Sequence, residues 1–98
     1  MKILGHNYTG GTRRGESGVY LHSYDATSGE RLPYDFVQAS PAEVDAAALA
    51  AASAFPTFRA LPAVKRAAFL DAIADELDAL GDDFVSLVTR ETALPAGR

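Results

Sequence analysis

The clearest hydrophobic periodicity in this chain lies between Pro62 and Leu80. Apolar side chains recur there at steps of four and three, which places them on one face of a helix: Phe69, Ile73, Leu77 and Leu80. Aspartates repeat at the same steps on another face: Asp71, Asp75 and Asp78. Pro62 suits the first helical position, and Gly81 suits the left-handed position just past the end. The pattern predicts an amphipathic helix over residues 62–80, whose apolar stripe needs a partner because a lone helix is marginal in water.

A capping box predicts the start of an earlier helix. Ser40 and Glu43 have the spacing at which each side chain accepts from the other residue's backbone N–H, and Pro41 suits the first helical position. The apolar face of this helix would consist of Val44, Ala48, Ala51 and Phe55. Further alanines, at 46, 47, 50 and 52, allow a neighbour to approach closely. Pro56 removes a donor and clashes with the preceding turn, so it should break or kink the helix, which is predicted to span about residues 41–55.

A third helix is predicted over residues 82–92. Asp82 can cap its start, and its apolar face would consist of Phe84, Leu87 and Val88. The segment 94–97, Leu-Pro-Ala-Gly, ends it.

Residues 1–38 have no helical period and carry six of the eight glycines and all four tyrosines. Val19 and Leu21 alternate with Tyr20 and His22, as half-buried strands do. Tyr34 and Phe36 alternate in the same way with Asp35 and Val37, which places Val37 on the open side. The segment 25–30 between them favours a turn, and a short first strand is expected near residues 7–9. The chain is therefore predicted to be an α+β structure, with an antiparallel β arm at about residues 7–37, within 1–38, and a helical segment over 39–98.

Composition narrows the range of functions. Thirteen acidic against nine basic residues give a net charge of −4, which argues against nucleic acid or an anionic membrane as partner. There is no cysteine, so a disulfide, a thiolate nucleophile and a cysteine-based metal site are excluded. The first residues contain no apolar run long enough for a signal peptide or a membrane span, and a cytoplasmic location is expected.

Each candidate for chemistry in the sequence has a plainer explanation. The segment 10–17 has the spacing of a phosphate-binding loop, but Glu16 stands where the lysine should be, which favours a glycine-rich hairpin loop. His6 and His22 lack partners at metal-ligand spacing, and the aspartate row lies opposite the apolar stripe, as a solvated face would. Ser53 and Ser86 fall inside helices without a nucleophile elbow. No catalytic, cofactor-binding or metal-binding residue is assigned.

Several segments, in order along the whole chain, resemble the N-terminal part of the aldehyde dehydrogenase superfamily. They are Asp25 to Glu30 (DATSGE), the alanine-rich helix that starts at Glu43-Val44-Asp45 and ends in Ala54-Phe55 and Arg59, Arg66 to Asp75 (RAAFLDAIAD), and Glu91-Thr92. The ends of the chain, KILG at 2–5 and ETALP at 91–95, are similar to the branch that oxidises 2-oxoglutarate semialdehyde (2,5-dioxovalerate) with NADP.

The resemblance implies that residues 1–98 are an incomplete N-terminal part of an aldehyde dehydrogenase domain, the arm and first helices that cover the cofactor domain. The nucleophilic cysteine, the general-base glutamate and the nicotinamide pocket would lie further on, so this chain alone is expected to bind no cofactor and to be inactive. NADP or NAD is implied for the full-length parent. In some members, backbone carbonyls near the positions of Ser23 and Tyr24 hold a monovalent cation.

Two kinds of partner are expected for the apolar helix faces: the remainder of a dehydrogenase chain, or another copy through self-association. The alternative to a dehydrogenase part is a stand-alone helical interaction module without catalytic activity.

Overall fold

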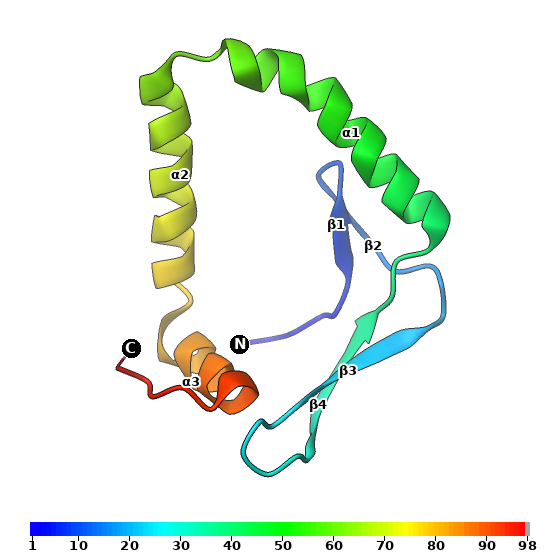
Figure 1. The fold of residues 1–98 in the computed structure, drawn as a ribbon, viewed down its shortest axis with the longest axis vertical. Coiled ribbons are helices and arrows are strands. Elements are labelled where there is room, and N and C mark those ends of the chain that lie inside the picture. The colour runs from blue at the N-terminus through cyan, green and yellow to red at the C-terminus, as the bar shows by residue number, and fades with distance from the viewer. Residues whose placement is uncertain (98) are drawn as a thin grey trace.

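The computed structural model describes residues 1–97 and contains two β-hairpins followed by three helices, which confirms the predicted α+β class. The elements are β1 (Asn7–Thr9), β2 (Thr12–Arg14), β3 (Tyr20–Tyr24), β4 (Arg31–Val37), α1 (Pro41–Ala60), α2 (Ala63–Asp78) and α3 (Gly81–Thr92). They form an open frame in which α1, α2 and α3 follow one another around the hairpins (Figure 1). The frame measures 47 × 35 × 18 Å, and its radius of gyration of 16.8 Å exceeds the ~13 Å of a compact domain of this length.

The glycines of the segment 10–17 include the two residues that form the turn of the first hairpin. β1 and β2 pair antiparallel with Thr9 opposite Thr12, so Gly10 and Gly11 form a two-residue turn. Their φ angles of +58° and +81° meet the demand of a type I′ turn for positive φ at both central positions. The expected hairpin loop is confirmed, since the chain reverses here without the strand-then-helix context of a phosphate-binding loop.

The second hairpin holds most of the core. β3 and β4 pair antiparallel with His22 opposite Asp35, and a bulge follows where Pro33 lies in β4 without an N–H to donate. Leu32 is fully buried and Val37 is buried at 8% exposure.

The strand alternation is only partly as predicted. Tyr34 and Phe36 are half-buried as expected, but Val19 and Leu21 are more than half exposed. Val37, expected on the open side, is buried because the N-terminal segment covers it. Its N–H donates to the Gly5 carbonyl at 2.8 Å.

Helix α1 begins as predicted and ends later than predicted. Ser40 Oγ accepts from the Glu43 N–H at 3.2 Å, and the Ser40 N–H donates to Glu43 Oε1 at 3.3 Å, so the capping box is confirmed. The predicted end at residue 55 is wrong, because the helix continues through Pro56 to Ala60. The carbonyl four residues before the proline belongs to exposed Ala52, where water can replace the missing donor.

The side of α1 that packs against the rest of the chain is its alanine side. Ala46, Ala47 and Ala50 are half-buried, and α1 contacts β1. The predicted apolar face is open, with Val44 at 56% and Phe55 at 57% exposure. Small side chains let the hairpin approach the helix axis, and the larger ones point elsewhere.

The connections around α2 differ from the prediction by one or two residues. Pro62 is the N-cap of α2 rather than its first helical residue, and α2 ends at Asp78 rather than at residue 80. Gly81 has the expected left-handed φ of +67°, but it counts as the first residue of α3. Asp82 is therefore already helical and does not cap α3. The capping position belongs to Leu80, whose backbone is helical and whose side chain makes no cap hydrogen bond.

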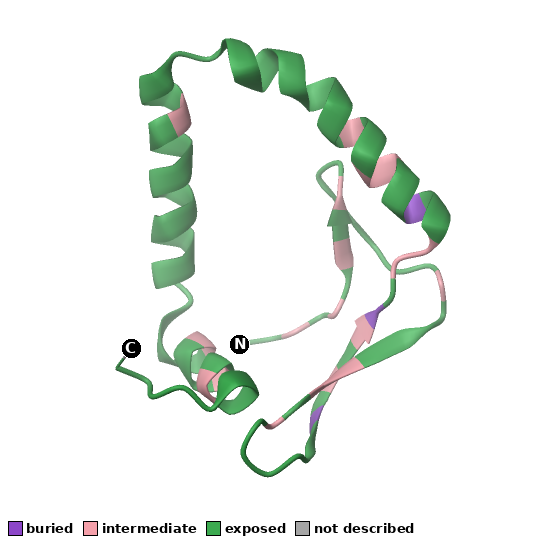
Figure 2. Ribbon diagram, in the orientation of Figure 1, coloured by how far each residue is buried: buried purple, intermediate pink, exposed green. Residues whose placement is uncertain are grey.

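Burial is concentrated at a few points. Among the described residues only Leu32, Val37 and Glu43 are buried, at the two ends of β4 and the start of α1 (Figure 2). Helices α2 and α3 are exposed along most of their length.

Candidate functional site

The histidines do not form a metal site. His22 Nδ1 lies 2.9 Å from Asp35 Oδ1 across the hairpin, and the Arg31 guanidinium contacts the same oxygen. His6 is exposed elsewhere on the N-terminal segment. Within residues 1–97 no group of three or more histidine, aspartate or glutamate side chains is placed to hold a metal ion. The implied cation site near Ser23 and Tyr24 stays a prediction; those two residues lie in β3 beside the bulge.

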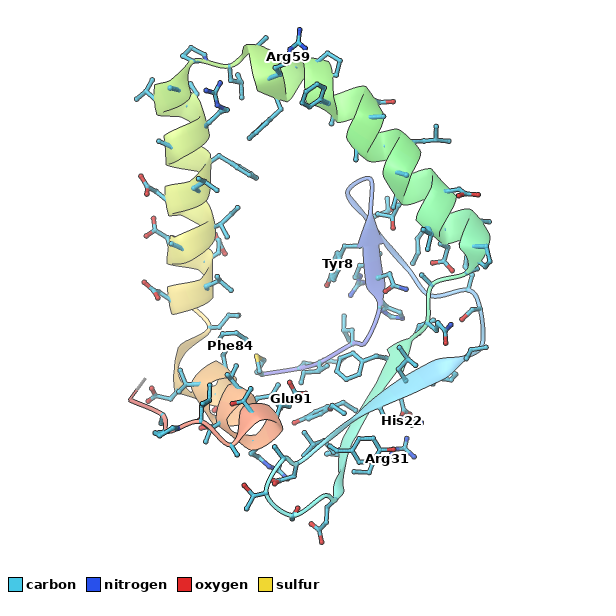
Figure 3. The ribbon with its side chains drawn as sticks, viewed as in Figure 1. Tyr8, His22, Arg31, Arg59, Phe84 and Glu91 are labelled. Carbon is cyan, nitrogen blue, oxygen red and sulfur yellow. The ribbon has the colours of Figure 1, made fainter. Side chains whose placement is uncertain are left out.

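The acidic and serine candidates lie on the surface. Asp71, Asp75 and Asp78 are all exposed, as a solvated face requires. In Figure 3 the oxygen-tipped side chains of α2 point mostly away from the centre of the frame, and its carbon side chains point mostly toward it. Ser53 is exposed on α1, and Ser86 is exposed on α3.

One polar cluster joins parts of the chain that are far apart in sequence. Asp25 Oδ1 accepts from the Thr27 and Ser28 N–H groups at 2.9 and 3.0 Å, and Asp25 Oδ2 accepts from Arg90 Nε at 3.2 Å. The Ala26 N–H donates to the Arg90 carbonyl at 2.8 Å. We call this contact the clasp, because it fixes α3 to the turn between β3 and β4.

The clasp stabilises the ionised form of Asp25. The Ser28 N–H, then the Thr27 N–H, then the Arg90 guanidinium lower the pKa of the carboxyl below its usual 3.8. The DATSGE segment indicated the turn, but the pairing with a residue 65 positions away has no local signal in the sequence.

An apolar surface on α1, α2 and the turn after α2 is left open by the rest of the described chain, and we call it the inner face. It consists of Phe55, Phe58, Phe69, Ile73, Leu77 and Leu80. All six side chains are exposed, from 41% for Phe58 to 57% for Phe55. The predicted stripe of α2 therefore exists, and within residues 1–97 little covers it.

Two open grooves follow the inner face. One of 460 Å³ runs along α2 between Phe69 and Leu80. The other, of 350 Å³, lies at the corner between α1 and α2, where Phe55, Phe58 and Phe69 meet. Phe69 lines both grooves and lies edge-to-face with Phe58 at 5.5 Å between ring centroids, so the two grooves form one surface.

Contacts at the corner hold this surface in shape. The Arg59 guanidinium lies 5.6 Å from the centre of the Phe55 ring, and the Arg66 side chain donates to the Leu61 carbonyl. An apolar surface held by its neighbours in this way can dock a partner.

Residues 15–98 match the sequence pattern of the aldehyde dehydrogenase family, and the chain belongs to that family. The family in general uses NAD(P).

Two curated relatives make the likeness more specific. Alpha-ketoglutaric semialdehyde dehydrogenase 2 of Azospirillum brasilense is 40% identical over 99 residues, which covers 100% of this chain and 19% of that protein. Alpha-ketoglutaric semialdehyde dehydrogenase of Acinetobacter baylyi is 35% identical over 94 residues, covering 96% of this chain and 18% of that protein. The chain thus spans about a fifth of the length of the curated relatives that it matches. No solved structure matches it.

The part of the chain that the structure describes contains no helix long and apolar enough to cross a membrane.

Proposed function

We propose that this chain is the N-terminal structural part of an NAD(P)-dependent aldehyde dehydrogenase that oxidises 2-oxoglutarate semialdehyde to the carboxylate. The inner face is the observation that carries this proposal, because six large apolar side chains stand open on two helices of a family member. Burying a side chain of this kind is worth roughly 1.5–3 kcal/mol, so a surface of six strongly favours a covered state. The rest of a dehydrogenase polypeptide is the proposed cover.

In this proposal the chain supports catalysis without taking part in it. Oxidation of an aldehyde by this family's chemistry needs a thiolate nucleophile, and the chain has no cysteine. The names of the two relatives and the resemblance of the chain ends support the substrate, and that resemblance alone supports the preference for NADP. The pure chain is expected to show no aldehyde-dependent reduction of NADP or NAD.

A chimaera tests the proposal. The matching residues of the A. brasilense protein are replaced by this chain, and reduction of NADP and of NAD is followed with 2-oxoglutarate semialdehyde and with a simple aliphatic aldehyde. The proposal expects a soluble chimaera that retains activity, prefers the semialdehyde and reduces NADP faster than NAD. A soluble, folded chimaera without activity would contradict it.

Two substitutions locate the role of the inner face in that chimaera. Ile73→Asp places a charge in the covered face and should abolish soluble, active enzyme. Asp75→Asn, two residues further on the wet face, is the matched control and should change little. Equal effects of the two changes would mean that the inner face is not covered.

Two measurements on the isolated chain, sedimentation and binding of an apolar dye, distinguish the proposal from a stand-alone module. The proposal expects self-association or exposed apolar surface. A monodisperse monomer that binds no dye would favour an autonomous interaction module.

A further inference from the structure

One charged residue lies inside the inner face. Glu76 follows Ile73 by three residues in α2, so the two side chains share one side of that helix. It lines the 460 Å³ groove together with Phe69, Ala72, Ile73, Leu77 and Leu80. Within residues 1–97 Glu76 makes no hydrogen bond and no ion pair of its own. Its neighbour Asp75 lies on the wet face of the same helix.

Covering the groove would remove the Glu76 carboxylate from water. A buried carboxylate without a partner costs far more than one that is paired, so a cover that fits this groove has to supply a cation or several donors. The two basic residues at the start of α2, Lys65 and Arg66, lie eleven and ten residues away along the helix, and Arg66 already donates to the Leu61 carbonyl. The groove therefore specifies the chemistry of its occupant.

We propose that the α2 groove receives an apolar segment of the same dehydrogenase polypeptide that carries one basic side chain, and that this side chain pairs with Glu76. The inference rests on the proposed function, because it takes its occupant from the rest of the enzyme. More than four fifths of each curated relative lies outside the match, so the relatives contain ample polypeptide to supply it.

A second copy of the chain fits the groove less well. In a symmetric antiparallel pair of α2 helices centred on the groove, the two Glu76 residues would lie about 5 Å apart along the axis. Two carboxylates would then be buried together without a cation, between chains that each carry a net charge of −4. The required basic residue has to come from a different segment.

The experiment compares charge at two neighbouring positions in the full-length chimaera described above. Glu76 is changed to Gln, Leu and Lys, and Asp75 to Asn, Leu and Lys, and the half-time of thermal inactivation is measured. The inference predicts the order Glu > Gln > Leu > Lys at position 76, with Glu76→Lys shortening the half-time roughly tenfold or more. The three changes at Asp75 should each alter it less than about twofold.

Each other result overturns the inference in a distinct way. If the half-time of thermal inactivation with Glu76→Leu equals or exceeds that with Glu76, the groove is covered by an apolar segment without a basic residue. If the two series behave alike, the groove is not covered. If the isolated chain forms a stable dimer that Glu76→Leu strengthens, the occupant is a second copy. Failure of the proposed function looks different, since a folded chimaera with Glu76 intact would then lack activity.

Discussion

Gly5 offers the sharpest test of how the N-terminal segment packs on β4. Its φ is +66°, and a Cβ added there would lie 1.9 Å from the backbone carbonyl oxygen of Asp35. The Gly5 carbonyl also accepts from the Val37 N–H at 2.8 Å. Gly5→Ala therefore cannot be relieved by turning a side chain, and the two backbone segments have to separate.

The expected cost adds two contributions. A left-handed alanine costs about 1–2 kcal/mol, and loss of the Val37 hydrogen bond costs about 1 kcal/mol, so opening of this region should become easier by about 3 kcal/mol. That corresponds to roughly hundredfold faster amide exchange in β4, measured by hydrogen–deuterium exchange and mass spectrometry of peptides that cover Arg31–Val37.

Gly29→Ala is the matched control for that experiment. Gly29 also has a positive φ, +77°, but no atom lies within 4 Å of an added Cβ. The Gly29→Ala variant has the free-energy cost of a left-handed alanine but no steric clash, so the rate of amide exchange in β4 should rise less than about tenfold. Equal rates in the two variants, or an unprotected β4 in the unsubstituted chain, would refute the packing described here.

Four further predictions concern single residues. Ser40→Ala should lower the free energy of unfolding by about 1 kcal/mol in urea titrations of the chimaera, because one N–H of α1 loses its acceptor. Leu32→Ala should cost about 2–5 kcal/mol in the same assay, because Leu32 is fully buried. Ala93→Gly should raise the melting temperature, with a gain of about 0.5 kcal/mol, because Ala93 has a φ of +58° at the end of α3. The pKa of Asp25 in the folded chain lies below 3.8, so the clasp should be intact above pH 3.8 and weaken as the pH falls through the lowered pKa. The Arg90 Nε–H resonance in NMR spectra should shift with this change in pH, and Asp25→Asn should remove the shift.

Features that depend on a few neighbouring residues could be predicted from the sequence. The Ser40–Glu43 capping box and the Gly10–Gly11 turn each satisfy their backbone groups within the segment itself, so no distant contact can override them. The amphipathic pattern of α2 likewise identified the face that stays open. For the same reason the candidate docking surface was within reach of sequence reasoning.

Features that depend on solvent or on distant segments could not be predicted. Pro56 would end a buried helix, but the open environment of α1 lets water serve the freed carbonyl, and the Arg59–Phe55 contact supports the last turn. The burial of Val37 needs the N-terminal segment beside it, and the clasp needs α3 beside a turn 65 residues away. Glu76 shows the same limit at the site, because its place among apolar residues follows from the helical pattern, whereas the basic partner that we propose for it does not.

The chain has a very small hydrophobic core of its own, which affects how it can be engineered. Leu32 and Val37 are its only buried hydrophobic residues among those described, so few of its apolar positions constrain one another directly. Polar replacements at Phe69, Ile73 and Leu77 would resurface the frame without opening a cavity in it, and would yield a more soluble, autonomous peptide. If the inner face is covered as we propose, the same replacements would prevent docking on the rest of the enzyme. Mutations that compensate for a change in the inner face would then be expected in the segment that covers it.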